Sequence, residues 1–416
     1  AIDIVRGKFS NPDKKEPGEV SHFQALTTAL SGTVGLGNIA GVGVALSIGG
    51  AGATFWMIVC GLFGMASKFT ECTLGVKYRN ENADGTVSGG PMYYLSKAFK
   101  EKGHAKTGKI LAVGFAIMTI FAAFGAGNMF QGNQANAMIV QTFGLAPGYG
   151  WITGIIFAIL LAGVIIGGMP SIGSVTSKLV PFMATLYVGM AVIVLVSHYD
   201  QIGAAFEQIF IGAFTGAGVA GGFIGALIQG LKRATFSNEA GVGSAAIAHS
   251  AVKTKEPITE GFVSLLEPFI DTVVICTMTA LVIIISGMNT GALSGVTLTA
   301  AAFTETSFIF EYFLALAVVM FAFSTMVSWS YYGLKAWTYL FGEGATTELV
   351  YKGIFCLFVI VGTSISFGAV IDFSDAAMFS MSIFNIIGLY YLMPIVKKEL
   401  NSFVARVNSG EIKRYK

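Results

Sequence analysis

The sequence predicts an all-α membrane protein with about ten transmembrane helices. Of its 416 residues, 54% are hydrophobic and 12% are charged, whereas about a quarter of the residues in a soluble domain are charged. Residues 23–67 and 110–177 contain no Asp, Glu, Lys or Arg, and each stretch is long enough for two helices of about 20 residues. A β-barrel would show short segments of alternating polarity instead, and the sequence has none.

About ten apolar segments are the expected spans, each long enough to cross the hydrocarbon core as a helix. Between the fifth and sixth spans, residues 201–212 are expected to form a short amphipathic helix on the outer surface. Residues 289–306 are long for an outer loop and are expected to form a lid. The expected spans are residues 23–46, 54–75, 110–139, 151–170, 179–197, 214–231, 262–285, 308–334, 353–370 and 376–394.

The 25 Lys and Arg residues fall on one side of these spans. They precede the first span, follow the last, or lie in or beside every second loop, whereas the intervening loops contain none. Loops rich in Lys and Arg stay in the cytoplasm. Both ends of the chain are therefore expected in the cytoplasm, with the protein in the cell membrane. The loops without Lys or Arg are residues 140–150, 198–213, 286–307 and 371–375.

The first expected span is weakened by its own glycines. Residues 28–46 read TALSGTVGLGNIAGVGVAL, with five glycines and Asn38. Each glycine lowers helix stability by about 1 kcal/mol, and unpaired peptide groups are tolerated at membrane depth only where they line a cavity. Broken helices of transporters use such groups to bind anionic substrates and cations. Close helix packing through small residues is the alternative interpretation.

A second break is expected in the sixth span, residues 214–231, where Gly221, Gly222 and Gly225 lie near the middle. Breaks in spans one and six are what a five-plus-five inverted repeat requires. The two stretches share only the placement of their glycines, so packing again remains the alternative. The expected division of the chain is a cytoplasmic segment 1–22, a first repeat 23–197, an outer loop 198–213, a second repeat 214–394 and a cytoplasmic tail 395–416.

Amides in the third span are candidates for lining a polar path. Asn128 and Gln131 are three residues apart and share one helix face. An amide that faces lipid would be costly, so both side chains are expected to face protein or a cavity. Hydrogen bonding between helices is the alternative role for either one.

Hydroxyl groups in the eighth span are candidates for binding a cation. Ser324, Thr325 and Ser328 follow helical spacing, and their oxygens suit a small hard cation. Trp329, four residues after Thr325, would form the floor of a small pocket. Hydrogen bonds to carbonyls of the same helix are the usual role of such hydroxyls and the alternative here.

Two acids lie inside the seventh span, and acids at membrane depth are functional candidates. Asp271 is the deeper and is expected either to bind a cation or to pair with Lys232 or Arg233. Glu267 is shallower and can reach water or a basic residue. Lys68 and Glu71 are expected to form a local pair.

No catalytic motif is found in the sequence. The four Cys and four His residues show neither metal-ligand spacing nor a nucleophile–base pattern, so the chain is not expected to be an enzyme. The lipid bilayer and a small solute are the expected partners, and nucleic acid is not. A transporter and an ion channel both remain compatible with broken, glycine-rich helices.

Three motifs resemble the sodium:alanine (alanine/glycine:cation) symporter family over nearly the whole chain. This resemblance implies a LeuT-type five-plus-five fold and Na⁺-coupled symport of alanine and glycine. It also places the third motif in the cytoplasm after span six. A symporter of another small solute, such as a nucleobase or sugar, is the nearest alternative. The motifs are SHFQALTTALSGTVGLGNIAGV (21–42), GGAGATFWM (49–57) and FSNEAGVGSAAIAHS (236–250).

The resemblance also implies residue roles. Carbonyl and hydroxyl oxygens would hold the coupling Na⁺, and Trp329 would limit the size of the substrate. The Na⁺ ligands would be Ser31, Val34, Phe321, Ser324 and Thr325. A second cation site would use Thr33 and Asn38, with Asp271. The substrate would meet Thr33, Gly35, Leu36, Gly37, Asn128, Gln131, Gly222, Phe223, Ile224, Gln229, Thr325, Ser328 and Trp329.

Within the substrate set, peptide groups would bind the two charged ends of an amino acid. The N–H groups of Leu36 and Gly37 would receive the carboxylate. Carbonyls of residues 222–224 would receive the ammonium group. Uncharged backbone, rather than ionised side chains, would therefore bind the cargo.

Overall fold

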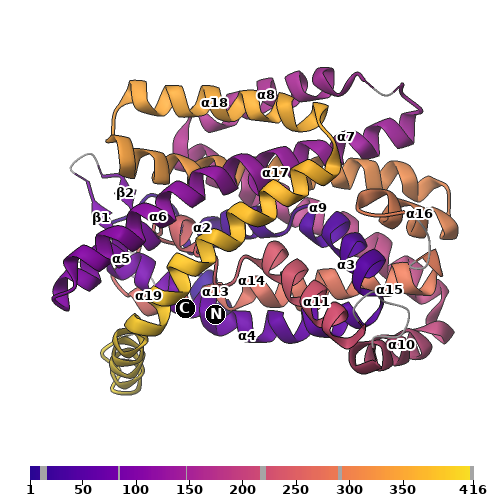
Figure 1. Ribbon diagram of the computed structural model, residues 1–416. Coiled ribbons are helices and arrows are strands. Elements are labelled where there is room, and N and C mark those ends of the chain that lie inside the picture. Colours follow the sequence, from indigo (N-terminus) through magenta and orange to yellow (C-terminus); the bar gives the residue numbers. More distant parts are fainter. Residues whose placement is uncertain (10–15, 83–84, 147, 216–221, 289–292, 413–416) are drawn as a thin grey trace.

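The computed structural model describes residues 1–9, 16–82, 85–146, 148–215, 222–288 and 293–412, which are almost entirely helical (Figure 1). Seven of the described helices are long and apolar enough to cross a membrane, and the pair His22–Thr33 and Gly37–Gly49 makes an eighth span bent by 45°. The remaining spans are the shorter apolar helix α8 (Gly150–Ile165) and a second broken helix, which is described below. The predicted polytopic α-helical class is confirmed.

The first half of the chain contains spans one to five, and the first span is formed by α2, η1 and α3. Its elements are α1 (Ile2–Val5), α2 (His22–Thr33), the π-helical turn η1 (Gly37–Gly41), α3 (Val42–Gly49), α4 (Gly52–Lys77), β1 (Asn80–Glu81), β2 (Val87–Ser88), α5 (Pro91–Glu101), α6 (Ala105–Phe124), the π-helical turn η2 (Gly125–Met129), α7 (Phe130–Phe143), α8 (Gly150–Ile165) and α9 (Gly168–Ser197).

The second half contains the remaining spans and the outer helices α10 and α16. Its elements are η3 (Tyr199–Gln201), α10 (Ile202–Thr215), α11 (Gly222–Asn238), α12 (Ala245–His249), α13 (Pro257–Ser264), α14 (Leu266–Pro268), the π-helical segment η4 (Phe269–Cys276), α15 (Thr277–Ile285), α16 (Val296–Thr306), α17 (Ile309–Phe341), α18 (Ala345–Ser364) and α19 (Phe367–Asn408).

Local sequence signals explain where several helices begin and end. The side chain of Ser21 accepts the N–H of Gln24, and the Gln24 side chain accepts the N–H of Ser21; this capping box satisfies donors at the start of α2. Gly144 closes α7 in the left-handed conformation, which glycine adopts without steric cost. Pro91 begins α5, where its missing N–H costs no hydrogen bond.

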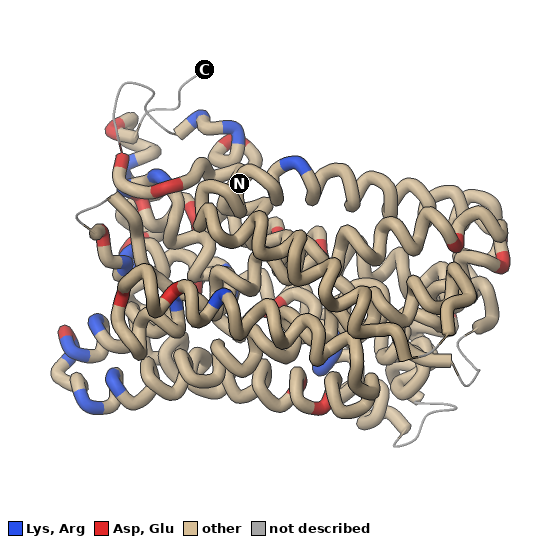
Figure 2. Tube along the Cα trace, turned by 90° about the horizontal axis from the view of Figure 1, so that it is seen from above, with Lys and Arg blue, Asp and Glu red and all other residues tan. Residues whose placement is uncertain are grey.

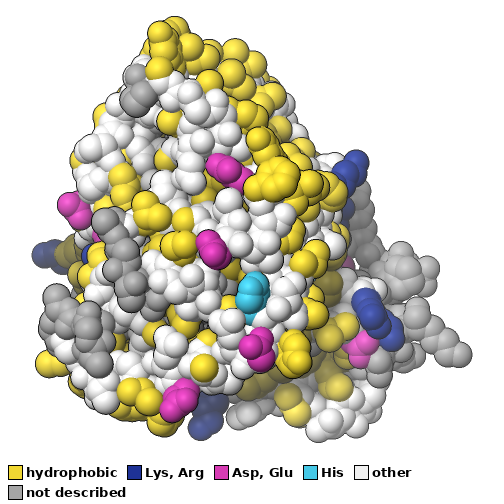
Figure 3. All heavy atoms as spheres, turned by 90° about the vertical axis from the view of Figure 1, so that its right-hand side faces the viewer, with side chains coloured by type: hydrophobic (Ala, Val, Ile, Leu, Met, Phe, Trp, Pro, Cys, Tyr) yellow, Lys and Arg dark blue, Asp and Glu magenta, His cyan; other side chains and the backbone are white. Residues whose placement is uncertain are grey.

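The two ends of the helical bundle differ in charge. Most Lys and Arg residues gather at the end that carries α5 and the β1–β2 hairpin, on the left in Figures 1 and 2. The opposite end, which carries α10 and α16, shows acids on its face, with Lys and Arg only at its margins (Figure 3). This asymmetry agrees with the pattern used to orient the chain. The cytoplasmic location of both ends and the exact repeat boundaries remain predictions.

The structure corrects the position of span six. Residues 216–221 of the expected span, including Gly221, lie outside the described residues, and the helix that follows continues to Asn238. After residues 239–244, α12 continues the span to His249. Helix α11 packs against α3, and α12 packs against α2, so the two halves of span six accompany the two halves of span one. The third motif thus lies inside span six, not in a cytoplasmic loop.

The sequence predicts the end of this span too early because of Lys232 and Arg233. They belong to α11 rather than to a loop, and both contact the carboxylate of Asp375 in α19. Arg233 is fully buried, and a buried cation is tolerated when it is paired. Because the ion partner lies far along the chain, hydropathy alone places the end of the span at the two basic residues.

Two expected outer elements are also found. Residues 202–215 form the helix α10, which includes most of the predicted amphipathic segment. Residues 296–306 of the expected lid form α16, and the Thr299 hydroxyl donates to the carbonyl of Ile39 in span one. Helix α16 therefore contacts the first break directly. Its role as an outer lid remains a prediction, and residues 289–292 of that segment lie outside the described residues.

Candidate functional site

The break in span one is present where the glycines predicted it. Helix α2 ends at Thr33, and the chain resumes in the π-helical turn η1 at Gly37. Every residue from 34 to 41 is buried. The side-chain oxygen of Asn38 accepts the N–H of Gly35 at 2.9 Å, and that of Gln131 accepts the N–H of Leu36 at 3.1 Å. Side-chain amides therefore satisfy the peptide groups that the helix leaves unpaired.

Oxygen atoms from α2 and α17 meet beside this break. The Thr325 hydroxyl lies 3.0 Å from the carbonyl oxygen of Ser31, and the Ser31 hydroxyl donates to the Ser324 carbonyl at 2.7 Å. The Ser324 hydroxyl donates to the carbonyl oxygen of Phe321 in the same helix at 3.0 Å, which is the alternative role given to these hydroxyls. A Cβ on Gly35 would overlap the Thr325 hydroxyl, which explains why that position is glycine.

These hydroxyl and carbonyl oxygens fit a small hard cation, which prefers uncharged and charged oxygen ligands over nitrogen or sulfur. Four of the five predicted Na⁺ ligands thus lie together, and the fifth, Val34, ends α2 directly before Gly35. The Ser328 hydroxyl donates to the carbonyl of Thr28 at 2.8 Å, about one helical turn away. Ser328 therefore ties α17 to α2 next to the oxygen cluster.

The third span lies on the other side of the break and contributes Gln131. Its amide N–H donates to the carbonyl of Ala126, which fixes the oxygen toward Leu36. Asn128 instead donates to the carbonyl of Phe355 in α18 at 2.7 Å. Of the two amides, Gln131 reaches the break, whereas Asn128 makes the contact between helices that was the alternative role.

Trp329 lies beside the break, as expected. It is 1% exposed, and a Cβ on Gly127 would overlap its indole, so the ring packs directly on the η2 backbone. Its N–H donates to a carboxylate oxygen of Glu239 at 2.9 Å. Trp329 therefore joins the third, sixth and eighth spans in one buried contact.

The structure contradicts the roles given to Gly222, Phe223, Ile224 and Gln229. Phe223 is 39% exposed and Ile224 is 61% exposed. Gln229 lies against Gly49 at the end of α3. All four belong to an uninterrupted helix, so their carbonyls are committed to backbone hydrogen bonds. Gly230, farther along this helix, serves packing against Ala53, because small residues allow helices to approach closely.

Among the described residues of span six, the helix is interrupted at residues 239–244. Glu239, Gly241 and Gly243 all have positive φ angles, of 57°, 82° and 93°. A Cβ on Gly37 would lie 3.1 Å from the Cα of Ser237, so the two breaks meet. Sequence reasoning missed Phe236, Ser237 and Glu239; the signal was the polar, glycine-containing stretch SNEAGVG, which is also typical of a loop.

Asp271 lies at the meeting point of the two breaks. Its carboxylate accepts from the side chains of Asn38 at 2.7 Å, Ser237 at 2.9 Å and Thr272 at 2.7 Å. Asn38 and Asp271 are therefore brought together through the NH₂ group of Asn38, and a cation site at this point remains a prediction. The Thr33 hydroxyl turns back to Ala29, and its carbonyl accepts the N–H of Gly35.

The alternative pairing of Asp271 with Lys232 or Arg233 is wrong. Both basic side chains contact Asp375 instead. The groups that contact the Asp271 carboxylate are hydroxyls and an amide, which carry no formal charge. A buried carboxylate with only neutral partners is a suitable ligand for a cation.

A chain of buried ionisable groups extends from the second break toward the start of span one. His22 contacts Glu260, and Glu260 contacts His249 through its other oxygen. The second ring nitrogen of His249 lies 2.5 Å from Glu267. Lys68 lies 3.1 Å from the other oxygen of Glu267, so the predicted local pair of Lys68 with Glu71 is wrong. Glu71 accepts from Asn385.

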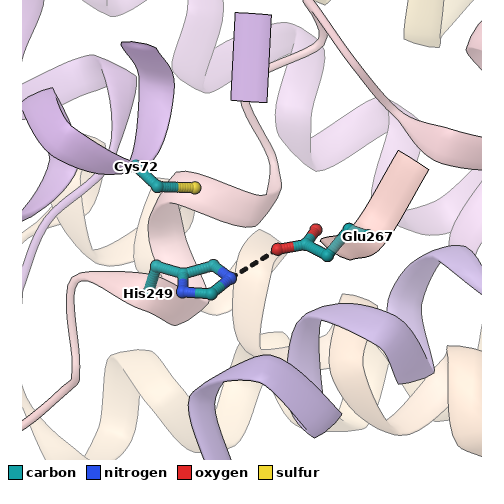
Figure 4. Close-up of side chains that lie close together, drawn as sticks. All are labelled: Cys72, His249 and Glu267. Carbon is teal, nitrogen blue, oxygen red and sulfur yellow. Dashed lines mark hydrogen bonds and ion pairs between the residues drawn. The ribbon is translucent and has the colours of Figure 1, made fainter. Parts of the chain in front are cut away.

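Cys72, His249 and Glu267 present one potential ligand atom each within 4.8 Å of one another (Figure 4). A metal ligand needs a ring nitrogen with a free lone pair. Both ring nitrogens of His249 face carboxylate oxygens, and Lys68 lies against Glu267. The arrangement suits an imidazolium held between two acids better than it suits a metal ion.

A family model of the sodium:alanine symporters matches residues 1–416. The sodium/alanine symporter AgcS of Methanococcus maripaludis is 42% identical over 396 residues, which cover 94% of this chain and 86% of that protein. The amino-acid carrier protein AlsT of Bacillus subtilis is 32% identical over 94% of this chain and 82% of its own length.

Solved structures show the same architecture. MhsT in complex with L-phenylalanine has a TM-score of 0.62 at 17% identity, over 90% of this chain and 88% of that one. A manganese transporter of Eremococcus coleocola has a TM-score of 0.57 at 14% identity, over 91% and 82% of the two chains. Identities this low show the LeuT-type fold alone. Taken with the match over its full length, the chain is a membrane transporter, not an enzyme, and belongs to the sodium:alanine symporter family.

Proposed function

We propose that this protein is a Na⁺-coupled symporter of small neutral amino acids, with alanine and glycine as its cargo. The observation that carries the proposal is the oxygen cluster of Ser31, Ser324 and Thr325 beside an unwound first span. The name of AgcS supports the same pairing of ion and cargo. The protein works in the cell membrane, with both ends of this chain in the cytoplasm.

Sodium is bound by Ser31, Val34, Phe321, Ser324 and Thr325. These residues come from α2 and α17, so the ion joins two helices at the point where the first one unwinds. The ligands on the first span stand directly before Gly35 and Leu36 in the chain. Binding of Na⁺ therefore orders the peptide groups that receive the substrate, and by linkage the substrate raises Na⁺ affinity by the same factor.

The substrate carboxylate is received by the N–H groups of Leu36 and Gly37. The Leu36 N–H is already directed toward a side-chain oxygen of Gln131, the kind of acceptor that a carboxylate oxygen can replace. The ammonium group is received by peptide carbonyls of the second break, residues 239–244. Trp329, which packs on the η2 backbone at Gly127, limits the substrate to a short side chain.

A second cation binds between the two breaks. Its ligands are the carboxylate of Asp271, the hydroxyl of Ser237 and the carbonyl of Thr33. Asn38 positions this site, because its NH₂ donates to Asp271 while its side-chain oxygen accepts the N–H of Gly35. The neutral surroundings of Asp271 support this assignment. Alanine uptake measured at two concentrations of Na⁺ tests whether Na⁺ is the cation that fills this site.

Uptake into proteoliposomes tests the proposal. Radiolabelled alanine should accumulate above its external concentration when Na⁺ is higher outside, and a K⁺ gradient of equal size should support no accumulation. Uracil and glucose serve as test cargo for the nucleobase and sugar alternatives. A channel would let solute equilibrate without accumulation. Alanine uptake that is indifferent to Na⁺ would overturn the symport proposal.

A further inference from the structure

Glu239 adopts a backbone conformation that ordinary residues avoid. Its φ angle is 57°, and it is the one non-glycine residue with positive φ among residues 1–9, 16–82, 85–146, 148–215, 222–288 and 293–412. Such a conformation costs about 1–3 kcal/mol for a residue with a Cβ. Gly241 and Gly243 take similar conformations nearby without that cost. The strained position therefore carries a side chain where glycine would be the easier choice.

The carboxylate of Glu239 is fully engaged within the site. One oxygen accepts the indole N–H of Trp329 at 2.9 Å, and the other accepts the hydroxyl of Ser244 across the break. Glu239 is 1% exposed. The nearby basic residues pair with other acids: Lys68 lies against Glu267, and Arg233 lies against Asp375.

We propose that Glu239 is a positioning residue that fixes the Trp329 indole and thereby sets the largest side chain the transporter accepts. The proposal rests on the proposed function of the site. Tryptophan has two side-chain torsions, and packing on Gly127 constrains the ring plane. The hydrogen bond from its N–H to Glu239 fixes the direction in which that plane points. Without this bond the floor of the pocket tilts, and longer side chains enter.

The geometry also links selectivity to the transport cycle. Glu239 lies on the unwound part of span six, whereas Trp329 lies on span eight. Any movement of the second break during the cycle therefore moves the acceptor of the Trp329 N–H.

Three substitutions of Glu239 separate the effects of its contact with Trp329, its charge and its length. Glu239→Gln keeps the reach and an acceptor oxygen, and its NH₂ can donate to the Ser244 hydroxyl. Glu239→Asp keeps the charge and tolerates the left-handed backbone, but its shorter side chain cannot reach the indole. Glu239→Met keeps the length of the side chain and loses both the acceptor oxygen and the charge. Because Asp suits the backbone well, its variant remains informative if Glu239→Met does not fold.

The readout is selectivity: the ratio of Vmax/KM for alanine to that for leucine, measured in proteoliposomes with Na⁺ saturating. Wild type and Glu239→Gln should share one ratio. Glu239→Asp and Glu239→Met should lower it by about ten-fold, the effect of losing one hydrogen bond to a charged group. The Na⁺ concentration for half-maximal uptake should stay the same, because the oxygen cluster on α2 and α17 is untouched.

Ser244→Ala is the matched control, because it removes the hydrogen bond to the other carboxylate oxygen and leaves the indole contact intact. Its ratio should stay close to wild type. If Ser244→Ala lowers the ratio as much as Glu239→Asp does, Glu239 acts by shaping the break and the proposal is overturned. A wild-type ratio in Glu239→Asp with a lowered one in Glu239→Gln would show a role of charge and also overturn it.

The failure of this inference is distinct from the failure of the proposed function. If wild-type protein shows no Na⁺-dependent alanine uptake, the proposed function fails and no ratio can be formed. If wild-type uptake is intact and all Glu239 variants lower Vmax equally for alanine and leucine, the role is structural and only the inference fails. Trp329→Phe, which removes the N–H and keeps an aromatic ring, should make the Glu239 substitutions silent on selectivity.

Discussion

The two breaks in the transport helices are held in place by different kinds of groups. At the break of span one, the N–H groups of Gly35 and Leu36 are accepted by the side-chain amides of Asn38 and Gln131. These partners carry no formal charge. The first break is therefore fixed by neutral hydrogen bonds. In the proposed function, a substrate carboxylate replaces them without leaving a buried charge behind.

At the break of span six, ionisable groups take over. Glu239 holds the indole of Trp329, and α12, which follows the break, ends in His249 between the carboxylates of Glu260 and Glu267. Breaking a His249 contact would leave a buried carboxylate without a basic partner, and breaking the Glu239 contact would leave a buried acceptor without its donor. The comparison teaches that the first break is built to exchange partners, and the second is built to keep its shape.

The largest expected effect follows from removing a charge near the second break. Lys68→Met removes the cation that lies against one oxygen of Glu267 and leaves His249 at the other. Removing one partner of a buried ion pair costs about 3–5 kcal/mol. We expect a large fall in the thermal midpoint of the purified protein in detergent. The measurement is a thermal unfolding scan with and without saturating Na⁺ and alanine.

Lys77→Met provides the matched control, because Lys77 pairs with Glu399 where both side chains are partly exposed, at 30% and 27%. An exposed pair contributes about 0–1 kcal/mol. Equal shifts for Lys68→Met and Lys77→Met would mean that the ionic chain behind the second break does not maintain its shape.

The second prediction concerns the backbone of the second break. Gly243 has φ of 93°, and an added Cβ would lie 2.7 Å from Pro91 and 3.0 Å from Asn385. Gly243→Ala should therefore cost about 1–3 kcal/mol in strain alone and should abolish uptake even in the fraction that folds. Transport assays on size-exclusion-purified protein test this.

Gly203→Ala is the control for Gly243→Ala, because a Cβ on that glycine of α10 meets no atom within 4 Å. It should leave uptake near the wild-type level. Normal transport by Gly243→Ala would show that residues 239–244 tolerate remodelling and are not the fixed element of the site.

The third prediction sharpens the role of the first break. Thr325→Val exchanges the hydroxyl that faces the Ser31 carbonyl for a methyl group of similar size. We expect about a ten-fold rise in the Na⁺ concentration for half-maximal alanine uptake, since one oxygen ligand is lost, with little change in the thermal midpoint. Thr338→Val is the control on the same helix, because the Thr338 hydroxyl donates to the carbonyl of Lys335, away from the oxygen cluster. It should leave the Na⁺ dependence unchanged.

The first break could be predicted from sequence because its polar signal stands out. Gly35, Gly37 and Asn38 interrupt a stretch without a single charge, and the oxygen-bearing residues of span eight follow helical spacing. Both signals are local patterns of residue type and spacing, so they indicate the first break and its hydroxyl groups without knowledge of any tertiary contact. The fold then brings these groups together.

The second break could not be located in the same way. Its neighbours include Arg233 and Glu239, and charged residues in a sequence usually indicate the end of a membrane span. Both are buried through partners on other helices, Asp375 and Trp329. Such compensation is visible only in three dimensions, and the apolar glycines upstream offered a more familiar pattern. The same limit hid the ionic chain that ends at His22.

The smallest expected effect tests the corrected position of the break in span six. The family resemblance implied a place for Ile224 beside the substrate, whereas the structure places it on α11 with 61% of its surface exposed. Ile224→Ala should change the KM for alanine by less than about two-fold, in line with surface substitutions within about 0.5 kcal/mol. Phe236→Ala is the contrasting variant, since this buried ring packs on Phe130 at 4.9 Å beside the second break, and its loss should raise the KM well beyond that. If Ile224→Ala raises the KM for alanine and Phe236→Ala does not, the substrate binds near the upstream glycines, and residues 239–244 are not part of the site.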